Sequence, residues 1–170
     1  MRVVRVQEGV KAARGGRPTD EPVGTSVGRP GLYDFLRVSE ASLQLVNNAQ
    51  MEPEQVLVLA TNTGVTEAEI KNALSVVVLP KRPPNDKSPS KEQYGFSLNE
   101  IGPDVLAHAR PVKVEQIPNE KEYSETHSFR YVAEVGEVLY IKVKNGMRSA
   151  GGYVLGRPSE HMLMVPEFPK

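Results

Sequence analysis

The side chains of this chain whose types and spacing could form a catalytic site are histidines, hydroxyls and carboxylates, and its 170 residues include no cysteine. The lack of cysteine excludes disulfides, cysteine-ligated zinc, iron–sulfur clusters, thiol nucleophiles and a cysteine-derived thioester. The three histidines are His108, His127 and His161, and none has a metal-ligand spacing or lies beside a paired carboxylate motif. We therefore expect surface or loop histidines and predict no metal site and no cofactor.

One short stretch holds the residue types of a hydrolase. Ser124, Glu125, His127 and Ser128 lie close together in the sequence. A Ser-His-acid site requires these groups to meet in space, and the chain has no Gly-x-Ser-x-Gly elbow. Chance clustering before a strand is the favoured interpretation, with no catalytic residue predicted. The alternative is a freestanding hydrolase-like domain that uses His127 with Glu125 or Glu122, and a pocket in which these groups converge would distinguish the two.

The remaining candidate motifs do not indicate a phosphate or nucleic-acid site. Gly151-Gly152 follows Arg148, but the chain has neither the P-loop nor the dinucleotide-binding pattern, so a bend or bulge is predicted there. Lys and Arg together number 21, as do Asp and Glu, and the pI is about 6.9. Aromatic residues make up 6% of the chain, with no tryptophan. This composition argues against binding to nucleic acid or to anionic membranes.

Short runs of alternating apolar and polar residues dominate the pattern, as expected of half-buried strands. The clearest run places Leu139, Ile141 and Val143 on one face with Lys142 and Lys144 on the other. Fourteen glycines and fourteen prolines also favour strands and loops over a helical bundle. The predicted strands lie near residues Val3–Val6, Ala41–Val46, Gln55–Thr61, Leu74–Leu79, Pro111–Ile117, Phe129–Val135, Val138–Lys144 and Met162–Val165.

Several connections can also be predicted. The Val-Gly-Glu join at Gly136 suggests an antiparallel hairpin between the strands on either side. Short helices are expected near residues 66–74, which open with the capping box of Thr66 and Glu69, and near 102–108, which follow Gly-Pro. Residues 9–31 and 80–97 are rich in glycine or proline and are predicted to be long loops.

These elements predict an all-β fold with minor α: an antiparallel β-sandwich of seven to eight strands with immunoglobulin-like architecture. No apolar run approaches ~20 residues, so no membrane span is expected in this segment. The N-terminus has no signal-peptide pattern. The predicted inward residues are Phe129, Tyr131, Leu139, Ile141 and Val143, with Leu43, Leu45, Val56 and Val58.

The stretch from Tyr123 to Phe168 resembles the N-terminal region of the large bacterial alpha-2-macroglobulin-like proteins. The residues that carry this resemblance are Glu-Tyr-Ser-Glu-Thr-His-Ser-Phe-Arg-Tyr, then Val-Gly-Glu-Val-Leu-Tyr-Ile-Lys-Val-Lys-Asn-Gly-Met-Arg-Ser-Ala-Gly-Gly-Tyr-Val-Leu-Gly, and then Val-Pro-Glu-Phe-Pro. Upstream, Tyr33-Asp34-Phe35 and Met51–Leu59 are similar to the same region, and residues 1–32 resemble it more weakly. None of these motifs is catalytic, so the resemblance implies a scaffold piece.

The resemblance implies a macroglobulin-like, fibronectin-III-like sandwich over residues 33–165. Residues 1–32 would contribute a strand and a long loop to the same domain, and 166–170 would link to a following domain. It implies a non-catalytic module of a periplasmic or cell-envelope protease-trapping protein. Its partners would be adjoining domains of the parent chain and proteases met by the full-length protein, with other envelope proteins as further candidates. A freestanding partner-binding domain is a further alternative.

Overall fold

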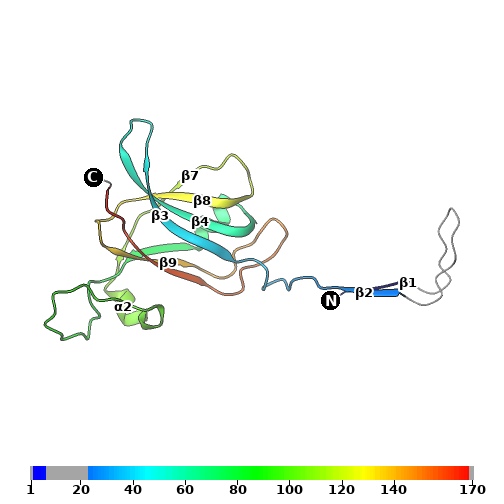
Figure 1. The fold of residues 1–170 in the computed structure, drawn as a ribbon, viewed down its shortest axis with the longest axis horizontal. Helices are drawn as coiled ribbons and strands as arrows, with labels where there is room; N and C mark the ends of the chain where they lie inside the picture. The colour runs from blue at the N-terminus through cyan, green and yellow to red at the C-terminus, as the bar shows by residue number, and fades with distance from the viewer. Residues whose placement is uncertain (1, 7–22, 169–170) are drawn as a thin grey trace. The chain divides into compact units, whose positions relative to one another are not determined.

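The structure, a computed structural model, describes residues 2–6 and 23–168 and divides the chain into two compact units, residues 1–31 and 32–170. In the first unit, β1 (Arg2–Val6) pairs antiparallel with β2 (Val23–Val27) (Figure 1). The expectation of one long loop over residues 9–31 is therefore wrong for β2, while residues 7–22 lie outside the described part. Gly24 obscured β2 in the sequence, since glycine is uncommon inside strands.

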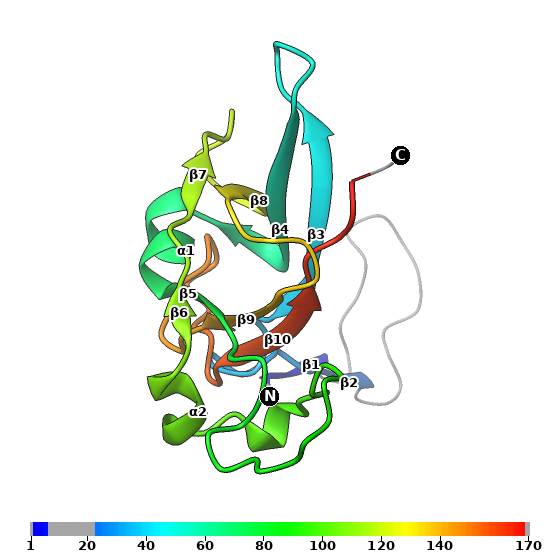
Figure 2. The same cartoon turned by 90° about the vertical axis from the view of Figure 1, so that its left-hand side faces the viewer.

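The second unit contains two four-stranded sheets. The first sheet has the order β3-β4-β8-β7 and the second the order β10-β9-β5-β6, with every pairing antiparallel. Their bounds are β3 (Val38–Asn47), β4 (Pro53–Val65), β5 (Leu74–Val78), β6 (Arg110–Pro111), β7 (Glu115–Ile117), β8 (Ser124–Tyr131), β9 (Val138–Val143) and β10 (Ser159–Met164). The two sheets lie face to face (Figure 2). The predicted antiparallel β-sandwich is confirmed.

The main core fills the space between the two sheets. Phe129 and Leu59 come from one sheet, Leu139, Ile141 and Val143 come from the other, and all five are fully buried. Tyr131 joins the same cluster, and Leu43 packs against it from β3. The inward facing predicted for β8 and β9 is thus confirmed, because alternation in these strands has a single clear phase.

The predicted facing of β4 is wrong by one residue. Leu57 and Leu59 belong to the core between the sheets, whereas Val56 and Val58 do not. Pairing explains the phase, since residues directly opposite in adjacent strands share a face. Leu57 lies opposite the inward-facing Phe129, and Val58 lies opposite Ser128.

The hairpin predicted at Gly136 is also wrong. Gly136 has φ +82° and occupies a turn, but β8 pairs with β4 and β7, while β9 pairs with β5 and β10. The chain from Val132 to Glu137 therefore crosses from one sheet to the other. Both a hairpin and a crossover place an alternating strand on each side of a short turn, so the pattern alone did not separate them.

The region predicted as one strand over Pro111–Ile117 is likewise divided between the sheets. The backbone amide of Val112 donates to the carbonyl of Val76, 3.0 Å away, and holds this part of the chain at the second sheet. Three residues later, Glu115 pairs with Arg130 in the first sheet. Residues 112–114 consequently bridge the two sheets.

Both short helices form as predicted. In α1 (Glu67–Ala73), the Thr66 hydroxyl accepts from the amide of Glu69, and Ile70 is buried. The helix α2 (Pro103–Ala107) begins with proline after Gly102. A single 3-10 turn, Leu98–Glu100, precedes α2. Neither helix of the described chain is long and apolar enough to cross a membrane.

The long loop predicted over residues 80–97 is organised around Arg82. Its guanidinium forms an ion pair with Asp86 at 2.7 Å and donates to the carbonyl of Glu92 at 2.8 Å. Within the same loop, Gln93 donates to the carbonyl of Gly136 in the crossover, at 3.1 Å. The loop is thus attached to the sandwich close to the segment that joins its two sheets.

Candidate functional site

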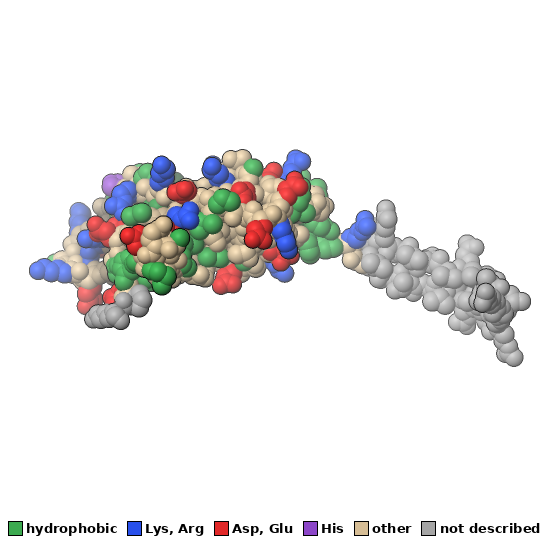
Figure 3. Space-filling model, turned by 90° about the horizontal axis from the view of Figure 1, so that it is seen from above, with side chains coloured by type: hydrophobic (Ala, Val, Ile, Leu, Met, Phe, Trp, Pro, Cys, Tyr) green, Lys and Arg blue, Asp and Glu red, His purple; other side chains and the backbone are tan. Residues whose placement is uncertain are grey.

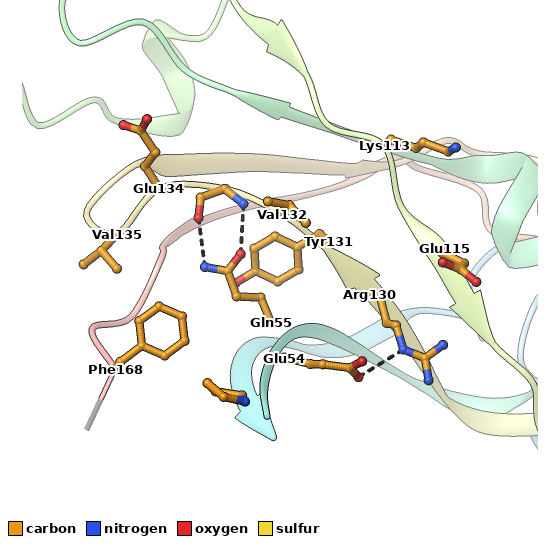
Figure 4. Close-up of a pocket in the computed structure, with 12 residues that line it drawn as sticks. Glu54, Gln55, Lys113, Glu115, Arg130, Tyr131, Val132, Glu134, Val135 and Phe168 are labelled. Atoms are coloured by element: carbon orange, nitrogen blue, oxygen red, sulfur yellow. Dashed lines mark hydrogen bonds and ion pairs between the residues drawn. The ribbon is translucent and has the colours of Figure 1, made fainter. Parts of the chain in front are cut away.

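A groove of about 750 Å³ opens where β8 ends and the crossover begins (Figure 4). It lies among the start of β4, the end of β8, the bridge before β7 and the last described residues of the chain. Its lining residues are Pro53, Glu54, Gln55, Lys113, Glu115, Arg130, Tyr131, Val132, Ala133, Glu134, Val135 and Phe168.

The groove exists because two strands separate. The pairing of β7 with β8 ends at Glu115 and Arg130. The next hydrogen-bonded pair in that ladder would be Lys113 with Val132, but residues 112–114 cross to the other sheet, where Val112 is bonded. Figure 4 shows Lys113 and Val132 on diverging segments. The side of β8 that β7 would cover is therefore open at Val132.

Gln55 fixes the opposite side of the same segment. Its amide nitrogen donates to the carbonyl of Ala133 at 2.8 Å, and its amide oxygen accepts from the Ala133 N–H at 2.9 Å. The Gln55 side chain thus replaces a strand partner after the β4–β8 pairing stops at Tyr131. These two bonds fix the backbone of Ala133 just beyond the end of β8.

The groove has an apolar rim with charges at one side. Val132 is 87% exposed, and Val135 and Phe168 are each 44% exposed. Apolar side chains gather beside the last described residues in Figure 3. Glu54 and Arg130 form an ion pair at 3.0 Å at the other side of the groove. Such a mixture of exposed apolar surface and rim charge is typical of interaction surfaces.

Tyr131 contributes an unusual polar atom to this region. It is 3% exposed, and its hydroxyl is buried without a hydrogen-bond partner. Burial raises the pKa of Tyr131 to about 12, so the hydroxyl stays protonated at neutral pH. It is available as both donor and acceptor, but not as a base.

His127 is a buried structural residue, contrary to the expectation of a surface or loop position. It is fully buried in β8, opposite Leu59. Its Nε2 lies 2.9 Å from the carbonyl of Ser124, and its Nδ1 lies 3.0 Å from the side-chain nitrogen of Asn119. A carbonyl can only accept, so Nε2 carries the proton and Nδ1 accepts from Asn119. Both ring nitrogens are therefore occupied.

The structure does not bring the hydrolase candidates together. Glu125 and Glu122 are exposed and make no hydrogen bond or ion pair with His127, and neither they nor His127 line the groove. The hydroxyl of Ser124 binds the backbone of Thr126 instead. The signal that could have identified a buried His127 is its alternation with Phe129 and Tyr131.

The other candidates are also dispersed. His161 lies in β10, its Nε2 2.7 Å from the hydroxyl of Ser159, and His108 caps α2. Gly152 has φ +79° and occupies a tight turn closed by a bond from its amide to the carbonyl of Ser149. Within the described residues, no three His, Asp or Glu side chains are grouped to hold a metal.

We expect the two partly or fully buried histidines to make stability depend on pH. Desolvation lowers the pKa of His127 and of His161 from the ordinary value of 6.5. The unfolded chain therefore binds more protons than the folded chain near pH 6, and the free energy of unfolding should fall as the pH is lowered through about 6.5. Urea unfolding measured between about pH 8 and about pH 5 checks this. A His127→Gln variant with an undiminished pH slope would contradict the assignment to His127.

The chain is similar in sequence to three known bacterial proteins. No family model matches the chain, and no solved structure matches it. The alpha-2-macroglobulin homolog of Yersinia pestis is 29% identical over 168 residues, or 97% of this chain. The alpha-2-macroglobulins of Rickettsia conorii and Pasteurella multocida are each 26% identical, over 83% and 98% of the chain. The chain is therefore similar to part of the bacterial alpha-2-macroglobulins.

The chain corresponds to only a small part of these proteins. In each of the three curated relatives, the match covers 8% of the relative's own length. The resemblance inferred from the sequence is confirmed. The sequence pattern does not indicate the groove residues, because they come together only through the crossover and the bridge between the sheets.

Proposed function

We propose that this chain is a non-catalytic structural module of a large bacterial alpha-2-macroglobulin-like protein that traps proteases. The observation that carries the proposal is the match itself, which extends over nearly the whole chain and over 8% of each relative. In such a protein the module would pack against sister domains. Recognition and trapping of a protease would belong to the full-length molecule.

The site geometry supports a role without catalysis. The histidine with the most elaborate environment, His127, is buried and has partners at both nitrogens. The groove is lined by an ion pair, exposed apolar side chains and a tyrosine whose pKa is raised. A hydrolase would need a base and a nucleophile that meet at a substrate cleft. Ser159 and His161 are within hydrogen-bond reach of each other, but neither lines the groove.

The proposal also specifies surroundings and partners. The module would work in the periplasm or cell envelope. Its partners would be the adjoining domains of the parent chain, with proteases contacting the whole molecule and other envelope proteins as further candidates. Its contribution would be to hold neighbouring domains at fixed positions, as rigid modules with their own cores can do.

Incubation of the purified chain with several endoproteases and with small ester and peptide substrates tests the absence of catalysis. We expect no turnover and no retention of an active protease. Turnover that disappears in a His127→Ala variant would overturn the proposal in favour of the hydrolase alternative. A Thr126→Ala variant is the matched control, because it changes an exposed neighbour in the same strand that has no role in the hydrolase alternative.

The packing role is tested with a longer fragment of the parent protein. Amide hydrogen exchange of residues 32–168 is measured in the chain alone and in the longer fragment. We expect additional protection on exposed parts of the sandwich when the neighbouring domains are present. Identical exchange in the two samples would contradict packing against sister domains.

A further inference from the structure

We propose that the groove beside Val132 binds an extended polypeptide segment, which adds to the edge of β8 where β7 stops. The bound segment would carry one large apolar side chain with charged residues near it. This binding activity goes beyond the module role, because it assigns a peptide-recognition site to the chain itself.

The backbone of β8 provides the first argument. By alternation from Ala133, whose backbone groups are bound by Gln55 on the β4 side, Arg130 and Ser128 direct their backbone groups toward β7. Ala133 points its amide and carbonyl the other way, toward Gln55. Successive residues of a strand alternate, so Val132 directs its amide and carbonyl toward the groove.

The amide and carbonyl of Val132 have no backbone partner among the described residues. An unpaired N–H and C=O on an extended edge match the spacing of another polypeptide strand, which is how β-augmentation provides affinity. A compact small molecule would not reproduce that paired donor and acceptor along a strand. The backbone therefore favours a polypeptide as the occupant.

The side chains provide the second argument. Val132, Val135 and Phe168 give the groove an exposed apolar rim that a large apolar side chain would cover. Lys113 and Glu115 stand on the other side of the opening (Figure 4). Charges of both signs at that side favour a segment with a charged residue beside its apolar one, because complementary charges fix register.

Selection from a displayed library of random heptapeptides on the full 170-residue chain tests the proposal. We expect enriched sequences that contain a large apolar residue, include charged neighbours and lack proline at the centre. Enrichment of proline-centred sequences, or no enrichment, would overturn it. The module assignment makes no claim about peptide binding, so failure of the selection would not affect it.

Two substitutions of Val132 separate the backbone contact from the apolar contact. Val132→Pro keeps an apolar side chain but removes the amide hydrogen, while Val132→Ala keeps the amide and removes apolar surface. We expect Val132→Pro to weaken binding of the enriched peptides about tenfold or more, and Val132→Ala to weaken it less. Equal affinity for the wild type and Val132→Pro would overturn strand addition.

Nuclear magnetic resonance locates the contact and checks the fold. The enriched peptide should slow exchange of the Val132 amide in the wild type and shift the resonances of Val135 and Phe168. Protection confined to the exposed edge of β3 would overturn the assignment to this groove. The spectrum of free Val132→Pro shows whether the sandwich is retained in that variant. Phe168→Ser is a second variant, outside the strand, and we expect it to weaken peptide binding to the same extent.

Discussion

Ile141→Ala is expected to lower the free energy of unfolding by about 2–5 kcal/mol, the usual range for truncating a fully buried isoleucine. Ile141 is completely buried in β9, a central strand of its sheet, where it lies opposite Val76 and His161. Neighbouring strands hold the backbone on both sides, so the site cannot easily collapse around the cavity. Urea unfolding at neutral pH measures the change through the transition midpoint and slope.

Lys142→Ala is the matched control for this experiment. Lys142 is the next residue of the same strand, is partly exposed and points to the opposite face. We expect its effect to stay within about 0.5 kcal/mol, as for most surface substitutions. Equal losses of stability in the two variants would show that the facing of β9 is wrong.

Leu59→Ala is expected to cost a similar ~2–5 kcal/mol, while Val58→Ala should cost no more than about 1 kcal/mol. Leu59 is fully buried between the sheets, whereas Val58 is partly exposed and outside the main core. The comparison checks the phase of β4, which the sequence pattern predicted the other way round. A larger loss for Val58→Ala under the same urea titration would restore the original facing.

The sequence was informative where one physical pattern had a single solution. In β9, lysine alternates with aliphatic residues, so only one face can be buried. In α1, Thr66 has the amide of Glu69 within reach, which marks where the helix begins. In β4, every residue from Val56 to Leu59 is apolar, so the sequence pattern does not show which of them face the core. The pairing of β4 with β8 determines which residues face inward.

The groove could not be predicted from the sequence for a related reason. Its parts depend on Val112 bonding to the second sheet, on Gln55 replacing a strand partner and on β8 crossing over rather than folding back. Each of these features depends on contacts between residues that are distant in the chain, and the local sequence pattern is compatible with more than one connection. The expectation of no convergent catalytic site stays a prediction, as do the proposed domain boundaries at residues 32/33 and 165/166.

The pairing order has a consequence for how the sandwich folds. The innermost strand pairs, β4 with β8 and β5 with β9, join segments that are distant in the chain, as the contact between Gln55 and Ala133 across 78 positions illustrates. Loop-closure entropy must be overcome before these pairs gain their contacts, so a domain of this topology is expected to fold in milliseconds to seconds. The hairpin of β3 and β4 closes over a short loop and can form first. The other edge of β4 then remains unpaired until β8 is available. During synthesis, that edge stays unpaired until Tyr131 has emerged, and the nascent chain is most exposed to aggregation in this interval.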